Sequence, residues 1–184
     1  MTESIKSICR NASASLQYVA ENGIKNYKEF DIKCSELEDF NHMDIRDSEN
    51  YKNLFDDLKG IDGPVVYYFE IMSDNISTDI VNRIRQYSAS ENSKAIPAIK
   101  SKIPESKILY VGKVKKGFWG RLIQHLGFYK VNGTQGLQLY YWAKELDLDI
   151  KVRIFEFEPQ MAEFMSIIEN GLARELNPML GKHK

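Results

Sequence analysis

The sequence predicts an α+β fold in which a small three-stranded sheet is flanked by helices. Two segments rich in β-branched and aromatic residues, 65–69 and 108–111, are typical of buried strands. A third segment, 150–154, alternates apolar and charged residues, which indicates a half-buried strand. Helices packed on such a sheet would bury the remaining apolar stripes. Those stripes recur at helical spacing in the segments 119–128, 137–146 and 163–176.

The chain before the first strand, residues 1–62, is predicted to be a helical, acidic extension. Residues 1–26 carry an apolar stripe that indicates one helix, and residues 48–60 indicate a second. The second half of the extension contains ten acidic and four basic side chains. The remaining domain, 63–184, is expected to begin at the turn that Gly63 and Pro64 form.

An insertion is predicted between the first two strands, at residues 72–106. Residues 79–87 share an apolar face and indicate a helix there, whereas Pro97 and Pro104 limit regular structure further on. The second strand is expected to end at Gly112.

The composition is that of a soluble globular protein, with 43% apolar and 28% charged residues. The longest apolar run, 65–69, is far shorter than the roughly 20 residues of a membrane helix, so no membrane partner is expected. The first six residues lack the apolar core of a secretory signal. Only Cys9 and Cys34 are present, which favours reduced thiols and a cytoplasmic location over a disulfide scaffold.

Charge is distributed unevenly, although the net charge is only −1. Residues 1–107 carry 14 basic and 18 acidic side chains, whereas residues 108–184 carry 11 and 8. The segment 110–130 holds five basic side chains and no acid, so it is the predicted phosphate-binding surface. The phosphate-binding candidates are Lys113, Lys115, Lys116 and Lys130, with Asn177 further along the chain.

Aromatic residues in this basic segment allow two interpretations. Trp119, Phe128 and Tyr129 either stack on nucleic-acid bases or pack in the core beside a short helix.

Five side chains from separate predicted elements form a candidate hydrolytic site. Tyr67 and Tyr110 lie in the first two strands. Arg121 and His125 lie four residues apart on one helical face, and Glu169 lies on the last helix. Each alone has an ordinary explanation as a core ring, a solvated helix face or a surface carboxylate. Together they supply a base, a cation and a metal-binding carboxylate, which phosphodiester hydrolysis requires.

This arrangement resembles the GIY-YIG nuclease superfamily, including its UvrC-type and restriction-endonuclease-like members. Val65-Val66-Tyr67 is similar to the first motif and Tyr110-Val111-Gly112 to the second, and Lys113 matches the lysine that often follows. Arg121 resembles the helix arginine of the family, and Glu169 resembles its metal-binding glutamate. The resemblance covers residues 63–181 and implies a mostly antiparallel sheet.

The resemblance implies metal-dependent hydrolysis of a DNA phosphodiester bond, with Mg²⁺ or Mn²⁺ held by Glu169. Tyr67 would activate the water, and Tyr110 would position it or exchange roles with Tyr67. Arg121 would bind the scissile phosphate, and His125 would donate a hydrogen bond or a proton nearby. Lys113 would support the tyrosinate.

The chain departs from the family pattern at several positions. Val65 replaces the first-motif glycine, and about thirty extra residues precede Tyr110, an insertion that a loop absorbs at small entropic cost. One residue is added between Tyr110 and Arg121, and Gly181 stands where the family commonly has an asparagine, a role for which Asn177 is a candidate.

Two alternatives to the nuclease stay open. The first is a catalytically inactive module that still binds DNA, and the second is a protein-interaction module. A DNA partner is expected for the nuclease and for the first alternative. The sequence leaves the oligomeric state open, with a homodimer as one possibility.

Overall fold

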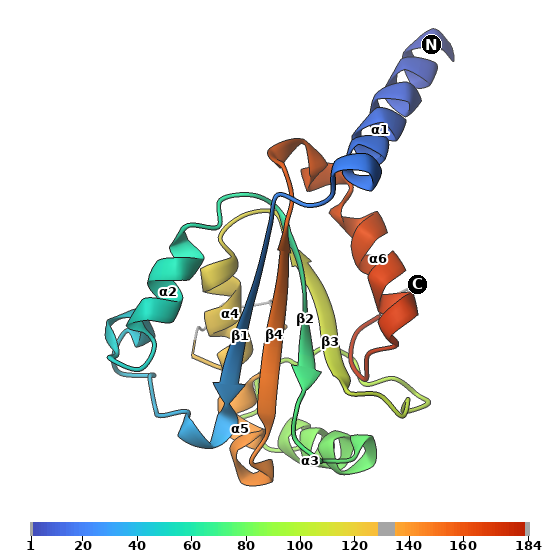
Figure 1. The fold of residues 1–184 in the computed structure, drawn as a ribbon. Coiled ribbons are helices and arrows are strands. Elements are labelled where there is room, and N and C mark those ends of the chain that lie inside the picture. The colour runs from blue at the N-terminus through green and yellow to red at the C-terminus, as the bar shows by residue number, and fades with distance from the viewer. Residues whose placement is uncertain (1, 129–134, 183–184) are drawn as a thin grey trace.

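The computed structural model describes residues 2–128 and 135–182, and it shows an α+β fold built on a four-stranded sheet (Figure 1). Every neighbouring pair of strands is antiparallel. β4 and β2 are the central strands, and β1 and β3 are the edges. In sheet order the strands are β1 (Asn26–Lys33), β4 (Asp149–Glu156), β2 (Val65–Ile71) and β3 (Ile108–Val114).

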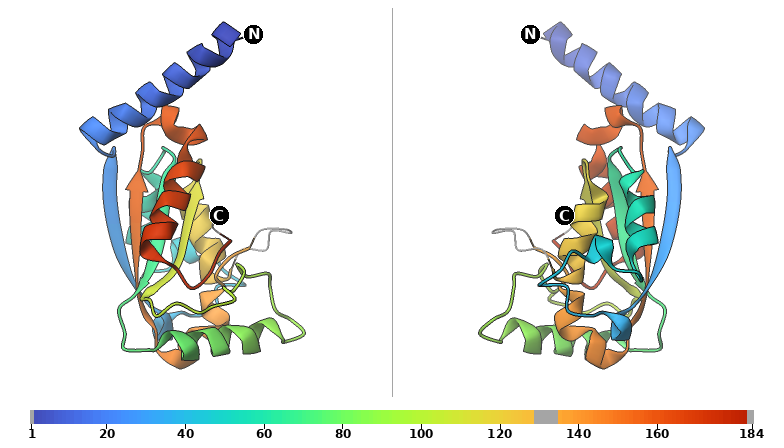
Figure 2. Two further views of the ribbon diagram at one scale, coloured as in Figure 1. Left: turned by 90° about the vertical axis from the view of Figure 1, so that its right-hand side faces the viewer. Right: turned by 90° about the vertical axis from the view of Figure 1, so that its left-hand side faces the viewer.

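Helices lie on both faces of the sheet and at its two ends. α1 projects from one end, and α3 lies at the opposite end (Figures 1 and 2). Short 3₁₀ turns connect several elements, among them η2 (Ile45–Asp47) and η4 (Pro159–Glu163). The α-helices in the described part of the chain are α1 (Thr2–Asn22), α2 (Lys52–Lys59), α3 (Ser77–Ser88), α4 (Phe118–Leu126), α5 (Leu139–Trp142) and α6 (Met165–Leu176).

The sheet has four strands rather than the predicted three, because part of the predicted helical extension forms β1. β1 pairs with β4 along its whole length. Ile32 is buried and Phe30 is half-buried, while Glu29 and Asp31, which alternate with them, are exposed. This alternation is the same signal that predicts the strand at 150–154, but it spans only a few residues and was missed in the sequence. Residues 26–61 therefore share the sheet and the core with the rest of the described chain.

The two faces of the sheet are covered by different helices. On one face the Tyr67 ring of β2 packs against Phe118 of α4, with ring centroids 4.9 Å apart, in the largest core cluster. On the other face Val66 packs against Met165, the first residue of α6. Val111 of β3 also packs beneath α6, against Ala173. The helices that carry the predicted site residues thus lie on opposite sides of β2 and β3.

β3 continues through Gly112, where the sequence predicts its end. Gly112 lies opposite Tyr67 in the register between β2 and β3. A Cβ atom on Gly112 would lie 2.7 Å from the Tyr67 ring and 2.6 Å from the Tyr110 ring. This position therefore needs glycine because two tyrosine rings approach the backbone closely.

The helix predicted over 137–146 is shorter in the structure, where α5 is followed by a 3₁₀ turn at Lys144–Leu146. Gln138 has a left-handed backbone, with φ of 59°, directly before α5, so the helix cannot extend toward the N-terminus. The other predicted helices and strands are present, with ends that differ by a few residues.

The insertion at 72–106 contains α3 and then returns to the edge of the sheet. Ile99 forms an isolated bridge with Leu180, which also bridges Tyr110 of β3. The Gly181 N–H donates to the carbonyl of Ala98 over 2.8 Å. The end of the insertion and the C-terminal segment therefore both lie beside β3.

We predict that Gly112→Ala destabilises the protein by about 1–3 kcal/mol, because the added methyl group pushes two rings apart in a packed core. The matched control is Gly120→Ala in α4, where a Cβ atom meets nothing within 4 Å. Alanine stabilises a helix relative to glycine by about 1 kcal/mol, so the control should gain stability. Urea unfolding measures both variants, and a loss of similar size in each would contradict the close contact at Gly112.

Candidate active site

The hydroxyl of Tyr67 lies between two side chains of α4. Tyr67 is fully buried, and its Oη lies 2.9 Å from Nε2 of His125. Nε of Arg121 donates to the same oxygen over 3.0 Å. α4 begins after Gly117, whose left-handed backbone turns the chain away from β3. The four-residue spacing then directs both side chains toward Tyr67.

His125 is a buried, neutral ring held in one tautomer. The N–H of Leu137 donates to Nδ1 of His125 over 3.2 Å. The ring hydrogen is therefore on Nε2, which donates to Tyr67. Burial and then the positive charge of Arg121 lower the pKa of His125 well below its usual 6.5. The structure thus excludes the solvated helix face as the explanation for His125.

Arg121 links the two tyrosines of the site. One guanidinium nitrogen, Nη1, donates to Gln124 over 2.9 Å, which fixes the plane of the group. The guanidinium lies beside the hydroxyl of Tyr110 as well as that of Tyr67. The two tyrosine ring centroids are 6.3 Å apart. One permanent positive charge is therefore shared by two phenol oxygens.

A pocket of about 310 Å³ gathers three of the predicted residues at the β3 edge of the sheet. Tyr110 and Lys113 reach it from β3, and Glu169 reaches it from α6. Tyr67 does not line the pocket, because it is buried against Tyr110. The other lining residues are Pro97, Ala98, Gln135, Gly181 and Lys182.

The pKa of both phenols is raised, mainly by burial, and Arg121 opposes this effect. Burial raises the pKa of Tyr110, the Arg121 guanidinium lowers it, and the carboxylate of Glu169 raises it again. Burial, and then the neighbouring Tyr110, raise the pKa of Tyr67. A cation bound by Glu169 would offset the effect of the Glu169 carboxylate on the pKa of Tyr110 and so favour the ionised phenol of Tyr110.

Glu169 forms an ion pair with Lys113, and its side chain is only 12% exposed. In the part of the chain that the structure describes, no group of three or more His, Cys, Asp or Glu side chains gathers as a metal cage. Mg²⁺ does not need such a cage, since one carboxylate with water and phosphate oxygens can complete its shell. Glu169 fits this open type of site, because it faces a pocket and already attracts a cation.

Sequence reasoning missed most of the pocket wall. Pro97 and Ala98 come from the insertion, and no local pattern connects them with the motifs. Gly181 stood out only as a departure from the family pattern. Its backbone φ is 111°, a conformation that residues with a side chain, asparagine included, rarely adopt. Glycine at this position therefore follows from the backbone path beside the pocket.

The predicted phosphate-binding residues are dispersed. Lys113 lines the pocket, whereas Lys115 and Lys116 lie exposed in the loop before α4. Lys115 forms an exposed ion pair with Glu163 at 2.6 Å. Lys130 lies outside the described residues.

Asn177 ends α6 with a left-handed backbone. Its Oδ1 accepts a hydrogen bond from Nζ of Lys100 over 2.9 Å. Lys100 belongs to the insertion, so this bond connects the insertion to the helix that carries Glu169. Asn177 does not line the pocket.

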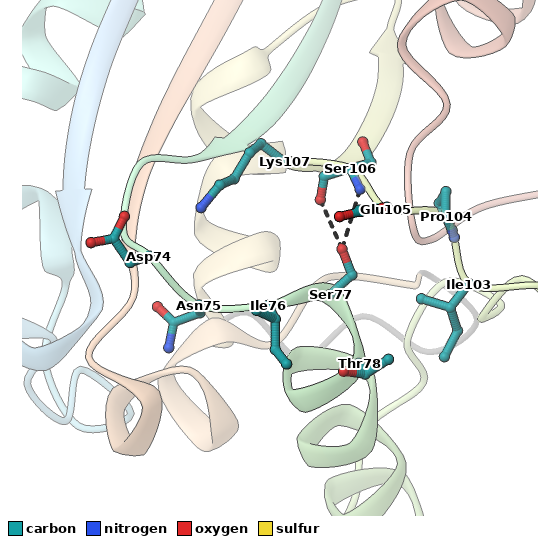
Figure 3. Close-up of a pocket in the computed structure, with 10 residues that line it drawn as sticks. All are labelled: Asp74, Asn75, Ile76, Ser77, Thr78, Ile103, Pro104, Glu105, Ser106 and Lys107. Carbon is teal, nitrogen blue, oxygen red and sulfur yellow. Dashed lines mark hydrogen bonds between the residues drawn. The ribbon is translucent and has the colours of Figure 1, made fainter.

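A larger cavity of about 500 Å³ lies at the start of α3, away from the predicted residues (Figure 3). Ser77 and Ser106 hold its walls together, with their hydroxyl and backbone groups 3.0–3.2 Å apart. Its charged lining residues are Asp74, Glu105 and Lys107, so acids outnumber bases, and none of the predicted site residues lines it. We therefore place the chemistry in the smaller pocket at β3.

Comparison with known proteins found no matching family model, no similar curated protein and no significantly similar solved structure. Within residues 2–128 and 135–182, no helix is long and apolar enough to cross a membrane.

We predict that His125 makes the protein less stable in acid. The unfolded histidine titrates near pH 6.5, whereas the folded pKa lies well below this value. The stabilising contribution is therefore fully present above pH 6.5 and is lost as the pH falls, by at most about 1.4 kcal/mol per pH unit. His125→Asn keeps an acceptor for the Leu137 N–H but removes the titration. Urea unfolding between pH 7 and pH 5 should show a smaller pH dependence for the variant, and equal slopes would contradict the prediction.

Proposed function

We propose that this protein is a metal-dependent endonuclease that hydrolyses phosphodiester bonds in DNA. The main support is the convergence of Tyr110, Lys113 and Glu169 on one pocket, with Arg121 beside Tyr110. These residues come from a strand and from helices on opposite faces of the sheet. Their convergence is therefore not a consequence of closeness in the sequence.

Tyr110 is the better placed of the two phenols to act as the general base. It lines the pocket, whereas Tyr67 does not. The Tyr67 oxygen already accepts hydrogen bonds from Arg121 and His125, so its lone pairs are occupied. The geometry therefore favours Tyr110 for taking a proton from water and Tyr67 for positioning Arg121. Of the two assignments that the resemblance allows, this is the one in which Tyr110 takes the role of the base.

Positive charge would bind and polarise the phosphate. Arg121 presents a planar donor group beside Tyr110, and Lys113 lies at the pocket wall. Glu169 would hold Mg²⁺ or Mn²⁺, which when bound supplies further positive charge to the phosphate. Lys113 would then exchange its ion pair with Glu169 for a contact with the anionic substrate. His125 is fully buried, so its role is to orient Tyr67 rather than to donate a proton to the substrate.

We also propose membership of the GIY-YIG superfamily on these residues. β2, β3 and β4 are the three strands that the resemblance implies, and they are antiparallel. β1 and α1 would then be additions at the N-terminus, and residues 72–106 an insertion that contributes to the pocket wall.

We predict that Glu169→Gln abolishes metal-dependent cleavage and leaves folding and DNA binding intact, because the amide keeps the shape but loses the charge that binds the metal. Glu163→Gln is the matched control, since Glu163 also pairs with a lysine but lies at an exposed position. A plasmid-nicking assay with Mg²⁺, with Mn²⁺ and with EDTA measures both variants. Wild-type cleavage by the Glu169 variant would show that the metal assignment is wrong.

We predict that Tyr110→Phe lowers the cleavage rate by about 100-fold or more, the range typical for loss of a general base. The rate of the wild-type protein should rise with pH throughout pH 6–9, because the pKa of Tyr110 is raised from its usual 10, and the variant should lose this dependence. Single-turnover cleavage across pH 6–9 measures the effect. A variant that keeps the full pH dependence would assign the base to another group.

One observation favours a catalytically inactive DNA-binding module as the second candidate. Lys113 already neutralises Glu169, so the pocket can bind an anion without a metal ion. DNA binding that weakens steeply with salt, without any metal-dependent product, would support this alternative over the nuclease.

A further inference from the structure

A second, aromatic pocket lies on α4 away from the candidate active site. Its volume is about 260 Å³, and its walls come from α4 and from the segment that precedes α2. Trp119 and Ile123 contribute from α4, one helical turn apart. The remaining lining residues are Phe40, Met43, Asp44, Ile45, Arg46 and Phe128.

Arg46 and Trp119 form the polar end of this pocket. The guanidinium carbon of Arg46 lies 5.0 Å from the centre of the Trp119 ring, which is a cation–π arrangement. Asp44 orients the guanidinium, because its carboxylate accepts from Nε of Arg46 at 2.8 and 2.9 Å. Trp119 is only half-buried, so its ring remains partly accessible to solvent.

Two further aromatic rings line the pocket and pack against each other. Phe40 and Phe128 pack edge to face, with ring centroids 5.2 Å apart and planes at 84°. Met43, at the rim, is 55% exposed. Aromatic rings and guanidinium groups are the groups on which nucleobases stack in proteins that bind single strands, and a flexible thioether adapts to varied partners.

α4 connects this pocket with the proposed cleavage site. Trp119 and Arg121 are two residues apart, so they lie on nearly opposite sides of the helix. A helix is about 10 Å across. A DNA strand with the nucleotide spacing of a duplex spans this distance with about three nucleotides. The exposed Lys115 and Lys116 precede α4 and would attract the intervening phosphates.

We infer that the pocket beside the stacked Arg46 and Trp119 side chains holds one unpaired nucleobase of the DNA strand, a few nucleotides from the phosphate that is cut. This inference rests on the proposed function, since it assigns a second contact on the same substrate. It also gives residues 40–46 of the acidic extension a part in substrate binding.

Tryptophan fluorescence with DNA tests the inference directly, in EDTA so that no cleavage occurs. Trp142 is 1% exposed, so a change on binding reports Trp119. The probe is a single-stranded dodecanucleotide, compared with a duplex of the same sequence and with an oligomer of the same length made of abasic nucleotides. We expect strong quenching by the single strand, weaker quenching by the duplex, and none by the abasic oligomer.

Trp119→Ala should weaken binding of the single strand about tenfold, the typical loss when one stacked base is released. Trp119→Phe keeps a ring and should bind nearly as well as the wild type. Tyr18→Ala, a 49% exposed aromatic on α1, is the matched control and should change nothing. Equal binding of abasic and normal strands, or full affinity in Trp119→Ala, would overturn the inference.

Nuclease activity is measured separately with Mg²⁺, so the two proposals can fail independently. Base-dependent quenching without any cleavage would support the pocket and count against the nuclease. Cleavage without base-dependent quenching would support the nuclease and overturn the pocket.

Discussion

The close packing of Tyr67 against the Gly112 backbone is the constraint on which the candidate site depends. Only a residue without a Cβ atom allows β3 to pass so near the two tyrosine rings. The buried Tyr67 hydroxyl then needs partners, because an unpaired buried hydroxyl is costly. Arg121 and His125 provide them. This requirement fixes the rotation of α4 and places the guanidinium beside Tyr110.

The candidate site lies around the edge of a sheet rather than in a cleft between domains. The α4 side of the sheet supplies Arg121, and the α6 side supplies Glu169. β3 is the edge strand, so side chains from both layers can meet beyond it. The insertion and the C-terminal segment then complete the wall with Ala98 and Gly181. Elements that differ from the family pattern therefore contribute to the pocket itself.

Much of the fold could be predicted from local pattern. The strand at Val65 and the helix around Leu122 follow from β-branched runs and helical spacing, which depend only on neighbouring residues. β1 was missed although Phe30 and Ile32 alternate with Glu29 and Asp31, because this alternating run is short and the strand is completed by pairing with β4. The helix predicted over 137–146 is present as α5, but its length could not be predicted, because the left-handed backbone of Gln138 precedes it and a 3₁₀ turn follows it.

For the site, the sequence by itself determined the residue types and their order: two strand tyrosines, an arginine and histidine at helical spacing, and a late glutamate. Those features are local, because they depend only on the periodicities of helices and strands. Only the tertiary structure decided which phenol faces the pocket, that His125 is buried and neutral, and that Pro97 lines the same pocket as Glu169. Burial and long-range contact depend on how distant segments pack, and no single segment encodes that information.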